Sequence, residues 1–211
     1  MINNLVNNGL NLTEWIENNN HCHIEGFEKD LIGEFLLSSP ALEVTARSNG
    51  FIERFKIVDS VGADVLFNHL TRDIDLCLVL DSSEKLKDKL EEKKLLYKHF
   101  WEKSEFILMT CNVPNNIENY IKENYCVKHT GLAKERNKMV LTSYKRLDAL
   151  FRHIRNSLAH GLYSSFGEDD NQIWVFQDHN QDQNISARLV LKQKRIHDWI
   201  TDFCRFETEG V

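Results

Sequence analysis

The stretch AKERNKMVLTSYKRLDALFRHIRNSLAHG, residues 133–161, predicts one long amphipathic helix that organises the fold. Its apolar residues recur at intervals of three and four, which is the spacing of a buried helical stripe. These residues are Val140, Tyr144, Leu147, Leu150, Phe151, Ile154 and Leu158. Gly161 suits the position just after the helix, where the backbone is often left-handed. A helix over residues 133–160 would be about 42 Å long.

The residues on either side of this helix predict a mixture of helices and strands. Downstream, strands at 173–176 and 185–191 flank a polar turn at 177–184 and form a hairpin, and a helix follows at 195–206. Upstream, the patterns predict helices at 2–19, 24–37, 42–55, 84–103 and 114–125, and strands at 63–67, 74–80 and 106–110. We therefore expect an α+β fold that is mainly α. Its three parts are N-terminal helices (1–56), a small α/β segment (57–128) and a C-terminal region (129–211).

The composition is that of a globular protein: 42% of the 211 residues are hydrophobic and 27% are charged. This excludes a disordered or collagen-like chain. No apolar run approaches the roughly 18 residues that span a bilayer, and the N-terminus lacks the features of a secretory signal. We expect a cytoplasmic protein that does not bind membranes. Five cysteines without a C-x-x-C motif indicate reduced thiols, and His21-Cys22-His23 lacks a second ligand pair, so no metal site is expected.

The net charge of −6 hides a basic stretch. From Lys128 to His160 there are eight basic residues and two acidic ones, a local charge of +6. Such a stretch is compatible with binding to a phosphate backbone, although on charge alone a solvated helix face is the preferred interpretation.

The end of the long helix, Arg155-Asn156-Ser157-Leu158-Ala159-His160-Gly161, carries residues suited to RNA cleavage. An imidazole can exchange protons with a ribose 2′-hydroxyl or a 5′-oxygen, and a guanidinium can hold the phosphate oxygens. Asn156 and His160 are four residues apart and share a face, and Arg152 and His153 extend this face into a polar stripe opposite the buried one. Arg155 lies about 140° round the helix from His160. A second copy of the helix would bring the two together. The alternative is that Asn156 and His160 only terminate the helix.

This motif resembles the R-x4-H motif of the HEPN superfamily. Ala187-Arg188-Leu189-Val190-Leu191 and Trp199 extend the resemblance, which covers about residues 131–206. It implies a HEPN-like helical bundle and a metal-independent endoribonuclease of a toxin–antitoxin or anti-phage system, with no cofactor. By resemblance Arg155 and His160 are catalytic and Asn156 supports them, and we expect Arg152, His153 and Tyr163 to bind substrate. The implied partners are RNA, a second copy of the chain, and an antitoxin or other defence protein. The alternative is a non-catalytic module that binds RNA, nucleotide or a protein.

Two weaker resemblances concern the middle segment. Asp64 and Asp75 faintly resemble the acids of a restriction-endonuclease-like core, but the acid-x-lysine pair is missing. Asp73-Ile74-Asp75 resembles the paired carboxylates of nucleotidyltransferases, without their Gly-Ser loop. An inactive scaffold is the preferred interpretation. We also expect Trp174, Phe176 and Trp199 to lie in the core rather than to stack on bases.

Overall fold

The fold was analysed in a computed structural model, which describes residues 26–42, 50–93, 104–128, 133–167 and 172–211. The helices are α3 (Phe27–Ile32), the π-helical η1 (Gly33–Leu37), α4 (Gly50–Arg54), α5 (Ser60–Leu70), α6 (Ser83–Lys93), α8 (Asn115–Tyr125), α9 (Ala133–Ala159) and α10 (Gln193–Glu209). The strands are β1 (Leu76–Leu80), β2 (Phe106–Thr110), β3 (Tyr163–Phe166), β4 (Ile173–His179) and β5 (Ile185–Lys192). The fold is α+β and mainly α, as the sequence predicts. No described helix is both long and apolar enough to cross a membrane.

The five strands form one mixed sheet in the order β1-β2-β5-β4-β3. β1 runs parallel to β2, and the other neighbouring pairs are antiparallel. Strands from the middle of the chain therefore pair with strands from its last third. The register places Met109 of β2 beside Ala187 of β5, and Asp178 of β4 on the other side of Ala187.

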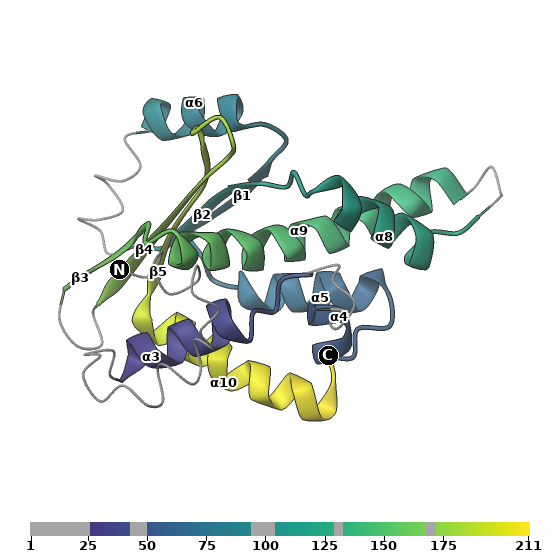
Figure 1. The fold of residues 1–211 in the computed structure, drawn as a ribbon, viewed down its shortest axis with the longest axis horizontal. Coiled ribbons are helices and arrows are strands. Elements are labelled where there is room, and N and C mark those ends of the chain that lie inside the picture. Colours follow the sequence, from purple (N-terminus) through teal and green to yellow (C-terminus); the bar gives the residue numbers. More distant parts are fainter. Residues whose placement is uncertain (1–25, 43–49, 94–103, 129–132, 168–171) are drawn as a thin grey trace, which may run out of the picture.

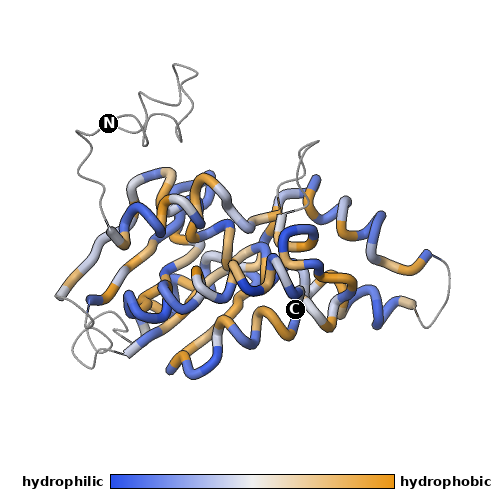
Figure 2. The backbone as a smooth tube through the Cα atoms, turned by 90° about the horizontal axis from the view of Figure 1, so that it is seen from below, coloured by the Kyte–Doolittle hydropathy of each residue, from blue (hydrophilic) through white to orange (hydrophobic). Residues whose placement is uncertain are grey.

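The sheet separates two layers of helices (Figure 1). The long α9 crosses one face together with α5, α10 and α3, whereas α6 covers the other face. All five residues of β2 are buried because both faces of this strand are covered. Ile107 and Met109 join the larger core under α9, and Phe106 and Leu108 join a smaller core under Leu86 of α6. The hydrophobic segments gather along the strands and inner helix faces, and the outer faces are hydrophilic (Figure 2).

Aromatic side chains fill much of the larger core, as predicted. The exposed fractions of Trp174, Phe176 and Trp199 are 5%, 0% and 2%. Phe27 of α3 lies against Trp174, with ring centroids 5.3 Å apart. These aromatic rings are therefore not available to stack on bases.

One predicted strand is wrong. Residues 63–67 lie in helix α5, which begins after Asp59, whose side chain accepts a hydrogen bond from the Gly62 N–H. The buried residues Ala63, Leu66 and Leu70 recur at helical spacing. Val65, which lies between Ala63 and Leu66, is exposed and raises the apparent strand preference without contributing to the core.

The other predicted elements lie close to their predicted places. α8 and α9 occupy 115–125 and 133–159, and β2 occupies 106–110. α6 begins at Ser83, and the predicted continuation beyond Lys93 lies outside the described residues. The predicted helix at 2–19 also lies outside them. Of the predicted helix at 42–55, residues 50–54 form α4 and residues 43–49 are not described.

Candidate functional site

The C-terminal end of α9 presents His160 to solvent. The Gly161 N–H donates to the Leu158 carbonyl at 3.2 Å and the Leu162 N–H to the Ser157 carbonyl at 2.8 Å. Gly161 has φ +66°, so these two bonds form the left-handed cap that glycine favours. The cap terminates the helix at His160, whose side chain is exposed. Among the described residues, none hydrogen-bonds to the His160 imidazole.

A cavity of about 620 Å³ lies one turn further back along α9, where the helix crosses the ends of β2 and β4. Arg155 and Asn156, both half-buried, line it together with Arg152 and His153. The cavity is completed by residues from three other regions. They are Ser83, Thr110, Asn112, Val113, Pro114, Asp178, His179, Asn180, Gln181, Asp182 and Ser186. His160 is not among the residues that line this cavity.

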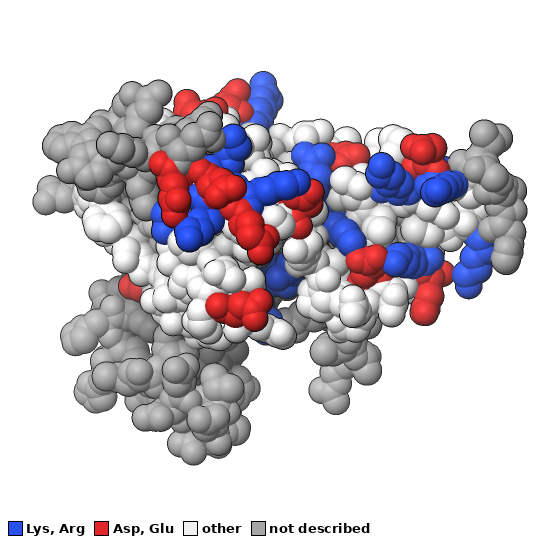
Figure 3. All heavy atoms as spheres, turned by 90° about the horizontal axis from the view of Figure 1, so that it is seen from above, with Lys and Arg blue, Asp and Glu red and all other residues white. Residues whose placement is uncertain are grey.

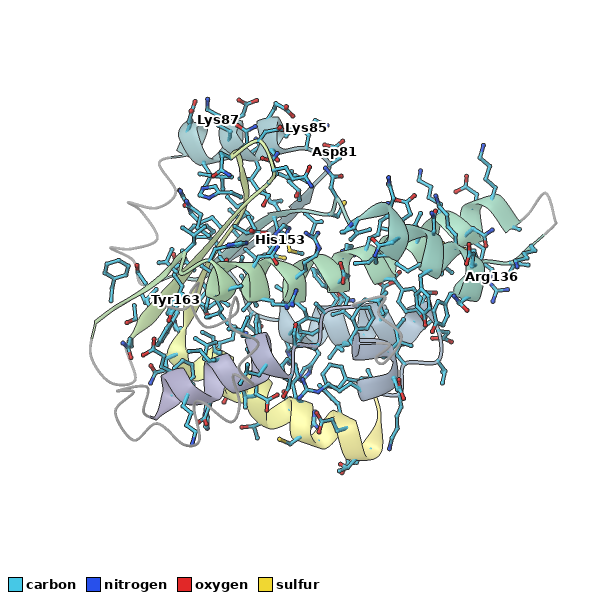
Figure 4. The ribbon with its side chains drawn as sticks, viewed as in Figure 1. Asp81, Lys85, Lys87, Arg136, His153 and Tyr163 are labelled. Atoms are coloured by element: carbon cyan, nitrogen blue, oxygen red, sulfur yellow. The ribbon has the colours of Figure 1, made fainter. Side chains whose placement is uncertain are left out.

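His153 is buried beneath this cavity rather than exposed on a polar stripe, which corrects the predicted placement. Its side chain is 1% exposed and lies between α9 and the sheet (Figure 4). Nδ1 lies 2.7 Å from Asp178 Oδ2, and Nε2 lies 2.9 Å from the Thr110 carbonyl oxygen. The ring is thus held between a carboxylate oxygen on one side and a backbone carbonyl oxygen on the other. His153 therefore contributes to the cavity wall from a buried position, with both ring nitrogens facing protein oxygen atoms.

Asp178 links the buried histidine to the motif. Its Oδ2 also accepts a hydrogen bond from Asn156 Nδ2 at 3.1 Å, and its Oδ1 accepts one from the His179 N–H at 2.9 Å. Burial alone would raise the pKa of Asp178, but the His153 and Asn156 hydrogen bonds and the Arg152 charge hold this pKa below its ordinary value. An ionised Asp178 thus fixes the amide of Asn156 at the cavity wall.

Arg152 is anchored on both sides. Its Nε donates to Asp148 Oδ2 at 3.2 Å, and Nη2 donates to the Asn112 carbonyl at 2.7 Å. Asp148 is fully buried and also accepts a hydrogen bond from the Leu42 N–H, which ties α9 to the segment before α4. Burial raises the pKa of Asp148, and Arg152 opposes that shift. Arg152 lines the cavity, but its charge is shared with this structural carboxylate.

Tyr163 lies outside the cavity. Its hydroxyl donates to Glu28 Oε1 at 2.9 Å, and its ring is stacked on Trp174 at a centroid distance of 6.1 Å. Burial and the Glu28 carboxylate raise the pKa of Tyr163 to about 12. The structure therefore places Tyr163 as a link between β3 and α3 rather than beside Arg155.

The basic stretch is spread over the length of α9 rather than gathered at the cavity. Arg136 lies near one end of the helix and His153 near the other (Figure 4). Lys145 forms an ion pair with Glu118, and the Arg146 guanidinium lies 4.2 Å from the centroid of the Phe67 ring. On the face seen in Figure 3, Lys and Arg side chains are interspersed with Asp and Glu.

The acids of the middle segment do not form a common site. Asp64, on α5, accepts a hydrogen bond from Ser143 Oγ, and Asp75 accepts one from the Glu105 N–H. Within the described ranges, no group of three or more His, Cys, Asp or Glu side chains is placed to hold a metal ion. His21-Cys22-His23 lies outside those ranges. The helical conformation of residues 63–67 removes the first strand that the restriction-endonuclease-like resemblance requires.

Sequence reasoning missed Asp178, because it assigned residues 177–184 to a turn. Trp174, Phe176 and Asp178 alternate along β4, and all three are buried. An acid that continues the inward face of a strand was the available signal. The missed acceptor on the other side of His153 is a backbone carbonyl, that of Thr110, which no side-chain pattern reveals.

Comparison with known proteins identifies one family. The family model described as HEPN pEK499 p136 matches residues 38–206, which include every residue of the cavity. No curated protein and no solved structure matches the chain significantly.

Proposed function

Because this chain belongs to the HEPN pEK499 p136 family, whose HEPN domain indicates a nuclease or RNA-related role, we propose that it is a metal-independent endoribonuclease. The observation that carries the proposal is the position of Arg155 and Asn156 in the wall of one cavity, with His160 exposed at the end of the same helix. By its resemblance to HEPN toxins and defence effectors, the activity belongs to a toxin–antitoxin or anti-phage setting in the cytoplasm. An antitoxin or other defence protein would then be a partner.

The chemistry we propose is internal transesterification. His160 accepts the proton of a ribose 2′-hydroxyl, the 2′-oxygen forms a bond to the adjacent phosphorus, and the bond from phosphorus to the 5′-oxygen breaks. The leaving 5′-oxygen takes up a proton from water, and the protonated His160 returns its proton to solvent, so the products carry a 2′,3′-cyclic phosphate and a 5′-hydroxyl. Arg155 holds the non-bridging oxygens as they gain charge. One N–H of the Asn156 amide donates to Asp178, which leaves the second N–H to donate to the 2′-oxygen.

The geometry favours a site shared by two chains. Arg155 lines the cavity and His160 does not, and the two residues lie about 140° apart around α9. A homodimer with its two-fold axis near the end of α9 would place the His160 of one protomer at the cavity of the other. Two-fold dimers are the commonest homo-oligomers.

The decisive experiment incubates the purified protein with RNA in EDTA. We expect cleavage to persist and the products to carry 2′,3′-cyclic phosphate ends. His160→Ala should lower the rate by about 100-fold or more, the usual contribution of a general acid or base. The matched control is His197→Ala, because His197 is also an exposed histidine on a helix. Loss of cleavage in EDTA that magnesium restores would overturn this mechanism.

A non-catalytic HEPN-like module that binds RNA, nucleotide or a partner protein is the second candidate. It is favoured by the absence of His160 from the cavity of a single chain. The same experiment separates the two functions, because a binding module would retain RNA without cleaving it.

A further inference from the structure

A second cavity lies between α6 and the turn that joins β4 to β5. Its volume is about 540 Å³. It is lined by Ser83, Glu84, Lys87, Leu90, Glu91, Gln183, Asn184, Ile185 and Arg188. Ser83, the first residue of α6, lines both this cavity and the Arg155 cavity. Asn180 Nδ2 lies 3.5 Å from Ser83 Oγ at this boundary. The two cavities therefore adjoin at Ser83.

Arg188 brings a positive charge into the second cavity, and no carboxylate of the described residues pairs with it. Its Nε and Nη2 donate to one neutral acceptor, Gln177 Oε1, at 3.1 and 2.6 Å. In the part of the chain that the structure describes, no carboxylate lies within ion-pair distance of Arg188. Burial lowers the pKa of Arg188, since it disfavours the charged form.

Three other half-buried arginines are neutralised by carboxylates, whereas the half-buried Arg146 lies over the Phe67 ring. Arg54 pairs with Glu34, Arg152 with Asp148, and Arg195 with Glu105. Removing a guanidinium from water is costly unless an opposite charge compensates it. Among the described residues, the Arg188 guanidinium hydrogen-bonds to the Gln177 amide oxygen, so we expect the compensating anion to come from a ligand.

We propose that Arg188 binds a backbone phosphate of the RNA strand whose scissile phosphate lies at Arg155, and that the strand passes over Ser83 between the two cavities. This inference rests on the proposed function and names the path of its substrate. Lys87 adds a second cation, offset by Glu91 at 3.8 Å. Glu84 and Glu91 also line the cavity, so the site suits one phosphate rather than a run of them. Gln183 and Asn184 provide amides for the adjoining ribose or base.

The test measures RNA binding separately from cleavage. A fluorescein-labelled 20-nucleotide RNA of mixed sequence is titrated with full-length His160→Ala protein, and anisotropy gives Kd at several salt concentrations. Adding Arg188→Gln should raise Kd about tenfold, because one charge-assisted phosphate contact is lost. It should also reduce the slope of log Kd against log salt by about 0.7, the value for one phosphate of a single strand.

Matched variants distinguish a phosphate contact from a structural role. Arg188→Lys should retain the salt slope, and Lys87→Ala, on the exposed face of α6, should reduce it without disturbing the sheet. Arg72→Gln should change neither quantity, since the Arg72 side chain is 77% exposed and pairs only with the exposed Asp73 in the described part of the chain.

The outcomes separate this inference from the proposed function. If Arg188→Gln and Lys87→Ala leave the salt slope at the value for Arg72→Gln, the inference is overturned even if the wild-type protein cleaves RNA. If the slope depends on Arg188 but the wild-type protein never cleaves RNA, the strand path stands and the endoribonuclease proposal fails.

Discussion

At the scale of single residues, the buried pair of His153 and Asp178 is the feature on which the site depends. Both side chains are almost fully buried, and Asp178 also holds Asn156. Removing Asp178 leaves the buried His153 Nδ1 and the Asn156 amide without their hydrogen-bond partner, so Asp178→Ala should lower the free energy of unfolding at pH 7 by about 2–4 kcal/mol. Chemical denaturation with urea measures this difference.

The stabilising contribution of Asp178 should depend on pH. Because the folded-state pKa of Asp178 is depressed, its stabilising contribution is fully present above the unfolded-state value of about 3.9 and is lost as pH falls through the folded-state pKa. The difference in the free energy of unfolding between wild type and Asp178→Ala should therefore become smaller below about pH 4. The control is Asp198→Ala, because Asp198 forms an exposed pair with Lys194 and its removal should cost less than about 1 kcal/mol. Equal losses in the two variants would contradict the buried-pair interpretation.

At the scale of elements, the C-terminal cap of α9 determines the position of His160. Gly161 has φ +66°, and a Cβ added there would meet no atom within 4 Å. Gly161→Ala should therefore destabilise the protein only through backbone strain, by about 1 kcal/mol, and thermal unfolding should show a lower Tm.

A second glycine provides the comparison. Gly33, between α3 and η1, has right-handed helical angles and also leaves space for a Cβ. Gly33→Ala should stabilise the protein by about 0.5–1 kcal/mol, because alanine loses less backbone entropy on folding. If both variants changed Tm in the same direction, backbone conformation at the glycine would be excluded as the cause of the change.

At the scale of the whole molecule, the proposed dimer predicts complementation between inactive chains. His160→Ala and Arg155→Ala proteins, each inactive alone, are mixed and allowed to exchange subunits. Random exchange makes half of the dimers heterodimers, each with one intact composite site, so RNA cleavage should recover to about a quarter of the wild-type rate.

The control mixes Arg155→Ala with the double variant Arg155→Ala/His160→Ala, which cannot form an intact site. Sedimentation of the mixtures shows whether subunits have exchanged. A fully active monomer, or exchange without recovery of activity, would rule out a site shared between protomers.

The sequence by itself determined the elements whose signals are local. The spacing of three and four in residues 140–158 predicted α9, Gly161 predicted its end, and the apolar run 106–110 predicted β2. Arg155, Asn156 and His160 could be selected as candidates because their chemistry and spacing are visible in seven consecutive residues. These predictions are possible because the position of a residue along a helix or strand determines on which face of that element its side chain lies.

Only the tertiary structure decided which polar residues are covered. His153 shares a predicted polar stripe with Asn156, but β2 and β4 place Thr110 and Asp178 against its ring and bury it. The meeting of the two cavities at Ser83 depends on α6, β4 and β5, which are far apart in the sequence. Periodicity along one segment describes only that segment. Burial depends on the partner that packs against it, and that partner is chosen by the sheet order β1-β2-β5-β4-β3.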